Sequence, residues 1–328
     1  MTRISETQLQ GQLLLGITRN RNQVAKFSNE ISTGLKVQNP GDSNLSGTIS
    51  SFRESLTKIE GYKDRVANVR SLLVFQDDIM AEMNDLLTRA KEIATQAANE
   101  TNSTTSRDQM AAEVFQIRDH IAQLANSTYQ GRYIYGGTDD DDPPFDPATY
   151  VNPGTGPESV RYVHDAEAGT GTTKTVNITD DLTIDVVTPG SQLFLNALNA
   201  LERLGRAMKG YETLPATGVP DGTGAAYTFP ADYGTQTTAI QNSIDLLDQA
   251  RENDIIPERT ALGGKMRRLD TADSLLELGR VNAEELLAKL QNADIIESAS
   301  SLTQAETALQ ASFAVTTRVL NLSILDFI

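Results

Sequence analysis

The chain has 328 residues with no cysteine, no tryptophan and two histidines, which excludes disulfides, thiol catalysis and histidine-rich metal sites. Its 44 acidic residues outnumber its 28 lysines and arginines, and the net charge of −16 argues against nucleic acid as a partner, because phosphate groups would be repelled. No apolar run approaches the roughly 18 residues that a membrane-spanning helix needs, and Leu13-Leu14-Leu15 is too short for the core of a cleaved signal peptide. We therefore expect no cofactor, no metal, no nucleic acid and no membrane partner.

Residues 5–32 predict an amphipathic helix. Apolar residues recur there at alternating spacings of four and three, with Asn20 as the one polar member: Leu13, Ile17, Val24, Phe27 and Ile31. Gly34 suits the position just after a helix end, and residues 39–42 (NPGD) are typical of a turn.

Residues 45–97 predict one long helix. Every seventh residue is apolar, without a miss: Leu45, Phe52, Ile59, Val66, Leu73, Met80, Leu87 and Ala94. At 1.5 Å per residue this helix would be about 80 Å long, and a strict period of seven indicates helical partners alongside it. Thr105 or Ser106 can cap the next helix, residues 106–126, whose short connection predicts that it folds back antiparallel on the long one.

Residues 138–192 predict a small β-rich insert. A short strand at residues 133–135 precedes it, and strands are expected at residues 160–163, 175–178 and 182–187, separated by turn residues. Eleven acidic residues face only Arg161 and Lys174 in this segment, so more than half of the charge imbalance lies in it. Such acidity is typical of a surface domain.

The pattern after residue 193 is helical again, with a loop at residues 210–233 and a break expected at Pro257. The last stretch carries two apolar stripes, which need more than one helical partner. The residues that we select from them as an assembly interface are Leu302, Leu309, Phe313, Val315, Leu320 and Phe327. Residues 1–40 carry a charge of +3 and residues 285–328 carry −3, which favours pairing of the two ends.

The predicted fold class is mainly α, with a long antiparallel helical bundle or coiled coil formed by the N- and C-terminal segments. Three domains are expected: residues 1–42 with 285–328, residues 43–137 with 193–284, and the insert at residues 138–192. Catalytic patterns fail on context, since Ser55-Leu56-Thr57-Lys58 has no following Lys-Thr-Gly and residues 139–142 lack the glycine and glutamate of a calcium loop. We expect no enzyme activity.

Four separated motifs resemble the flagellin family, and within it the hook-associated type of the hook–filament junction. Residues 1–5 (MTRIS) are similar to that type's opening, with one inserted threonine, and residues 32–37 (STGLKV) look like a motif of the whole family. Residues 131–137 (GRYIYGG), followed by Pro144-Phe145, are similar to the junction type's signature, and residues 322–328 (LSILDFI) resemble its tail.

This resemblance implies a structural subunit of the bacterial flagellum, located outside the cell and exported without a cleaved signal peptide. It also implies partners: copies of itself in a ring or layer, a neighbouring hook-associated protein, flagellin and an export chaperone. Two alternatives stay open, a flagellin of the filament and a secreted coiled-coil effector or adhesin. Arg89, Ile93 and Glu113 resemble flagellin residues that an animal innate immune receptor contacts, although helix packing is the favoured explanation for them.

Overall fold

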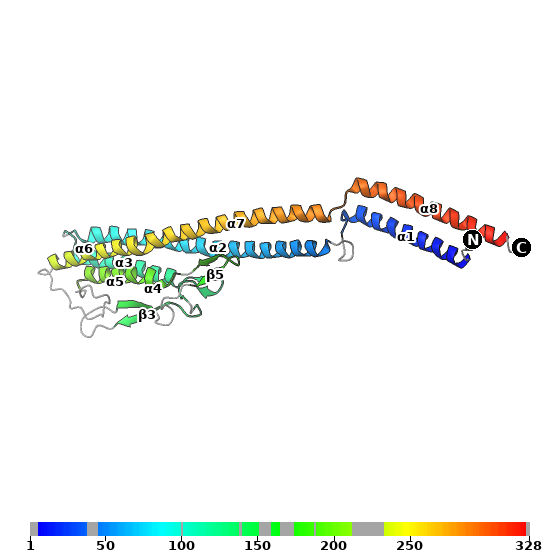
Figure 1. Ribbon diagram of the computed structural model, residues 1–328. Coiled ribbons are helices and arrows are strands. Elements are labelled where there is room, and N and C mark those ends of the chain that lie inside the picture. Colours follow the sequence, from blue (N-terminus) through cyan, green and yellow to red (C-terminus); the bar gives the residue numbers. More distant parts are fainter. Residues whose placement is uncertain are drawn as a thin grey trace. The chain divides into compact units, whose positions relative to one another are not determined.

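The computed structural model describes residues 6–37, 45–99, 101–137, 140–150, 159–164, 174–186, 188–211 and 233–325. These residues form long helices and small antiparallel hairpins (Figure 1), which confirms the predicted mainly α fold class. The chain divides into two compact units, Met1–Gly61 with Leu275–Ile328 (the terminal unit) and Tyr62–Ser274 (the inner unit). Helices α2 (Ser46–Ala97) and α7 (Ile256–Gln291) each contribute residues to both units.

Helix α2 confirms the long helix predicted from the heptad pattern. Its heptad positions in the inner unit are fully covered, with exposed fractions of 3% or less: Val66, Leu73, Met80, Leu87 and Ala94. In the terminal unit the same column is less covered, because Leu45 is 45% exposed while Phe52 and Ile59 are half-buried. The main hydrophobic core therefore lies in the inner unit.

Helices α3 (Thr104–Ala125), α5 (Leu195–Met208) and α6 (Tyr233–Ala250) complete the core of the inner unit. Ser103 caps α3, since its Oγ accepts the backbone N–H of Ser106 at 3.2 Å; the predicted caps at Thr105 and Ser106 are wrong by a few residues. Gly205 lets α5 approach α3, because a Cβ there would lie 2.5 Å from the Phe115 ring.

Buried charges also join α3 to α5. The Arg118 guanidinium donates to the Glu202 carboxylate, and the two side chains are only 5% and 3% exposed. Arg118 also donates to Asp119 at 2.7 Å and lies over the Phe115 ring. Pairing is what makes such buried charges tolerable.

Three antiparallel hairpins are present among the described residues: β1 (Thr128–Tyr129) with β2 (Arg132–Tyr133), β3 (Phe145–Tyr150) with β4 (Ser159–His164), and β5 (Thr175–Asn177) with β6 (Thr183–Asp185). Strands β4, β5 and β6 confirm the strands expected in the insert. The strand predicted at residues 133–135 ends at Tyr133, and β3 escapes prediction because it contains Pro147, which pairs with Tyr162.

The insert packs closely on the helices of the inner unit. The Phe145 side chain is fully buried, with its ring 6.1 Å from that of Phe194. The Asn126 amide donates to the Phe145 carbonyl at 2.7 Å and accepts its N–H at 2.9 Å. Gln76 of α2 donates to the Val186 carbonyl at 2.8 Å. By contacts, then, the insert belongs with the inner helices, whereas its folding as a separate domain stays a prediction.

Pro257 alters the helix locally, as expected. A π-helical turn, η1 (Arg251–Ile255), joins α6 to α7, and Pro257 is the second residue of α7. Because proline donates no backbone hydrogen bond and crowds the preceding turn, the wider π turn accommodates it.

Candidate functional site

The terminal unit contains the predicted assembly helices, α1 (Glu6–Thr33) and α8 (Ile295–Leu325). Gly34 ends α1 with a φ of +71°, and its N–H donates to the Glu30 carbonyl at 2.8 Å, as the sequence predicts. Asp294 begins α8, because its Oδ1 accepts the N–H groups of Ile296 and Glu297 at 2.9 and 3.1 Å.

The connection between α1 and α2 is hydrogen-bonded to the connection between α7 and α8. The Lys36 N–H donates to the Gln291 carbonyl at 2.7 Å, and the Ala293 N–H donates to the Gly34 carbonyl at 2.9 Å. Leu35 and Asn292 form an isolated antiparallel bridge between them. These backbone hydrogen bonds join residues 34–36 of the N-terminal part of the chain to residues 291–293 of the C-terminal part.

Helices α1 and α8 lie side by side and antiparallel (Figure 1). The Asn20 amide donates to the Ser312 Oγ at 2.8 Å and to the Ala308 carbonyl at 3.3 Å. The Ser298 hydroxyl donates to the Glu30 carboxylate at 3.0 Å, where Glu30 is only 6% exposed. The predicted pairing of the two ends is confirmed. Between the described residues of the two helices, however, these hydrogen bonds rather than ion pairs supply the polar contacts.

Most of the residues that we select as assembly interface are incompletely covered in the single chain. Phe313 is 50% exposed and Val315 is 49% exposed. Leu320 lies in α8, but its side chain is outside the described part, and Phe327 is outside the described residues altogether. The other members are half-buried: Leu13, Ile17, Val24, Phe27, Ile31, Leu302 and Leu309.

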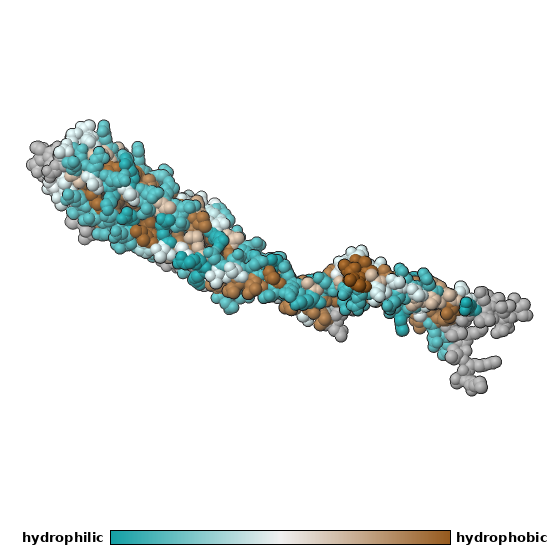
Figure 2. Space-filling model, turned by 90° about the horizontal axis from the view of Figure 1, so that it is seen from above, coloured by the Kyte–Doolittle hydropathy of each residue, from teal (hydrophilic) through white to brown (hydrophobic). Residues whose placement is uncertain are grey.

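Further large apolar side chains on the same two helices are more exposed still. Leu14 and Leu15 are 62% and 71% exposed on α1, and Ile295 and Ile296 are 56% and 84% exposed on α8. Figure 2 shows hydrophobic patches among hydrophilic surface on these helices. A helix pair covers only one side of each helix, so these faces can bury further apolar area against other chains.

Arg89 and Glu113, two of the three residues that resemble a receptor contact, form an ion pair across α2 and α3. Arg89 Nε and Nη2 lie 2.9 and 2.8 Å from Glu113 Oε1, and this hydrogen bond raises the pKa of the guanidinium. Ile93 is 2% exposed and belongs to the core. The geometry therefore provides a helix-packing role for all three, and only the ion pair is accessible from solvent.

The described residues contain no cluster of three or more histidine and acidic side chains that could hold a metal ion. No helix among them is long and apolar enough to cross a membrane.

Comparisons with known proteins place these features in context. The family model for the bacterial flagellin N-terminal helical region matches residues 4–140. Flagellar hook-associated protein 3 of Escherichia coli (strain K12) is 25% identical over 332 residues, and the match covers 98% of both chains. The protein of the same name from Salmonella typhimurium is 25% identical over 329 residues, again with 98% of both chains covered.

A solved structure, FlgL of Bacillus cereus, has a TM-score of 0.52 and 20% sequence identity. The match covers 73% of this chain and 99% of that one. At this identity the likeness concerns the fold alone.

Proposed function

Because this chain belongs to the flagellin family and is of its hook-associated type, we propose that it is a structural subunit of the bacterial flagellum. It forms the junction layer between hook and filament through contacts of its terminal helices with other subunits. The role is mechanical rather than catalytic, since assembly needs complementary surfaces and no reacting group.

One observation carries this proposal: α1 and α8 pair with each other and still leave large apolar side chains uncovered. Faces of that kind are characteristic of surfaces that other chains bury. The residues involved lie on both helices, so one subunit can contact neighbours on more than one side. This is what a closed layer of identical subunits requires.

The proposed partners are other copies of the chain, a neighbouring hook-associated protein on the hook side and flagellin on the filament side. An export chaperone would cover the apolar terminal faces before assembly. The proposed location is outside the cell, reached through the flagellum's own export apparatus without cleavage of a signal peptide.

Electron microscopy of flagella from cells that lack this protein tests the proposal. Hooks without filaments, with flagellin shed into the medium, are the expected result. A flagellin role would instead remove the filament protein itself, so that no flagellin would be shed. Normal filaments in the deletion strain would contradict the junction role and favour a secreted effector or adhesin.

A further inference from the structure

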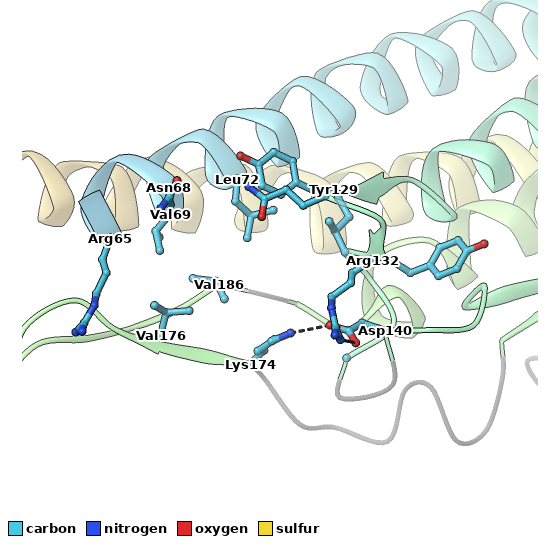
Figure 3. Close-up of a pocket in the computed structure, with 14 residues that line it drawn as sticks. Arg65, Asn68, Val69, Leu72, Tyr129, Arg132, Asp140, Lys174, Val176 and Val186 are labelled. Atoms are coloured by element: carbon cyan, nitrogen blue, oxygen red, sulfur yellow. Dashed lines mark hydrogen bonds and ion pairs between the residues drawn. The ribbon is translucent and has the colours of Figure 1, made fainter. Parts of the chain in front are cut away.

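A cavity of about 400 Å³ lies in the inner unit between α2 and the hairpins of the insert. Val69 and Leu72 of α2 line one side, and Val176 and Val186 line the other, facing them (Figure 3). This volume is within the range of roughly 300–1,000 Å³ that small-molecule sites occupy, and such sites combine apolar walls with a few polar groups. The cavity can therefore bury an apolar body of moderate size.

Three cationic side chains line the same cavity. Figure 3 shows Arg65 at one end of the apolar wall, with Arg132 and Lys174 toward the other. Among the described residues that line the cavity, Asp140 is the only acidic one, so three cations accompany one carboxylate there; Asp141 lies beside the lining, with its Oδ1 3.9 Å from Arg132 Nη1. In a chain with a net charge of −16, these described lining residues hold more cations than acids.

Asp140 holds two of these cations together. Lys174 Nζ lies 2.7 Å from Asp140 Oδ2, and Arg132 Nη1 lies 2.5 Å from Asp140 Oδ1. The hydrogen bond from Lys174 and, to a smaller extent, that from Arg132 hold the pKa of this carboxyl below its usual range. The three side chains, here called the clamp, are therefore all charged at neutral pH. Each oxygen of Asp140 thus positions one cation at the same end of the cavity.

Both cations have donors beyond those that the clamp uses. An ammonium group has three N–H donors and a guanidinium group has five, whereas each contact to Asp140 uses one. A ligand carboxylate can therefore accept hydrogen bonds from Lys174 and Arg132 without displacing Asp140. The Tyr129 ring, 5.8 Å from the Phe75 ring, also lines the cavity and offers a flat surface to an aromatic body.

We propose that this cavity is a binding site for an amphipathic organic anion, with an aromatic or branched aliphatic body and one carboxylate or sulfonate group. The body lies between the valines and Leu72, and the anionic group lies toward Lys174 and Arg132. A neutral apolar ligand would gain nothing from the cations, and a small inorganic anion would leave the apolar walls unfilled. This site is independent of the terminal assembly helices.

Isothermal titration of the full-length chain with 2-naphthoate tests the proposal, with 2-acetylnaphthalene as a neutral probe of similar shape. We expect saturable binding of one naphthoate per chain, with affinity at least tenfold above that of the neutral probe. Lys174→Met should lower the affinity for naphthoate about tenfold to hundredfold, the range expected when one hydrogen bond to a charged group is lost. It should leave the neutral probe unaffected, and Lys174→Arg should retain most of the affinity.

Val176→Phe should weaken both probes, because the larger ring fills the cavity. Arg53→Ala is the matched control, because Arg53 is an exposed cation of α2 outside the lining. This variant should bind naphthoate like the parent chain. Thermal unfolding confirms that each variant is folded. The proposal is overturned if the parent chain shows no saturable binding up to 1 mM naphthoate, if both probes bind equally, or if folded Lys174→Met binds naphthoate as the parent does.

Discussion

Replacement of Phe313 by aspartate should block assembly while leaving the single chain folded. Half of this side chain is exposed in the isolated subunit. Full burial of a phenylalanine contributes roughly 1.5–3 kcal/mol, so its exposed half contributes about 1 kcal/mol per subunit when a neighbour covers it. Phe313→Ala should weaken each contact by about that amount. Phe313→Asp should weaken each contact far more, because burying an unpaired carboxylate costs several kcal/mol. Each 1.4 kcal/mol lowers the affinity of the contact roughly tenfold.

Complementation of a deletion strain provides the assay. Cells that express Phe313→Asp should export the protein into the medium and carry hooks without filaments, as counted by electron microscopy. Thr307→Asp is the control, because Thr307 is exposed and lies about a third of a turn around α8 from Phe313, outside both apolar stripes. Normal filament numbers with Phe313→Asp, at wild-type export, would show that this face of α8 is not covered on assembly.

Four further predictions concern the rest of the chain. Gly205→Ala should lower the free energy of unfolding by about 1–2 kcal/mol in urea denaturation, because the clash with Phe115 outweighs a helix-propensity gain of about 1 kcal/mol. Gly61→Ala is the control and should be stabilising, because a Cβ at residue 61 would have no neighbouring atom within 4 Å. Glu202→Ala should cost about 3 kcal/mol by removing the buried carboxylate that faces Arg118, whereas Glu92→Ala, which removes a 63% exposed carboxylate, should change stability by less than about 1 kcal/mol. Limited proteolysis of the dilute subunit should remove both ends and leave a core near residues 43–284, because α1 and α8 need other subunits to cover them. If amide hydrogens at both ends exchanged as slowly as those of α2, this prediction would be wrong. If Arg89 and Glu113 form a receptor contact in addition to their helix-packing role, cells that report the innate immune receptor respond to micromolar purified subunit and respond less to Arg89→Ala; no response would contradict that hypothesis.

Helix positions could be read from the sequence wherever one physical signal dominated. The heptad column gave α2 almost to the residue, because an unbroken apolar period over 52 residues has no other good solution. Gly34 marked the end of α1 because its left-handed conformation favours glycine. The break between α7 and α8 contains neither glycine nor proline at residues 292–294, and its local signal is Asp294, which begins α8. The backbone contacts at this break are made with residues 34–36, which are distant in sequence.

The candidate sites show the same division. The assembly residues follow from periodicity, because a helix with two apolar stripes must bury both. How far each is exposed does not follow, since exposure depends on which stripe faces the partner helix. The cavity is harder to predict, because Arg65, Arg132 and Lys174 come from three segments separated by tens of residues. Their common location depends on how the hairpins pack on α2, which no local pattern encodes.

The contact surface between α1 and α8 contains polar residues that fix the alignment of the two helices at a cost in stability. Asn20 occupies a place in the apolar pattern between Ile17 and Val24, where a leucine would bury more apolar area. A polar side chain at such a position lowers the stability of a helix pair but permits only the alignment that satisfies its hydrogen bonds. The Glu30 contact with Ser298 lies ten residues further along α1 and ten to fourteen residues back along α8, so a slip of one turn would break both contacts. With the alignment fixed in this way, Phe313, Val315 and the other uncovered apolar residues take the same positions in every copy. A repeating layer needs that constancy, because each subunit must offer identical faces to its neighbours.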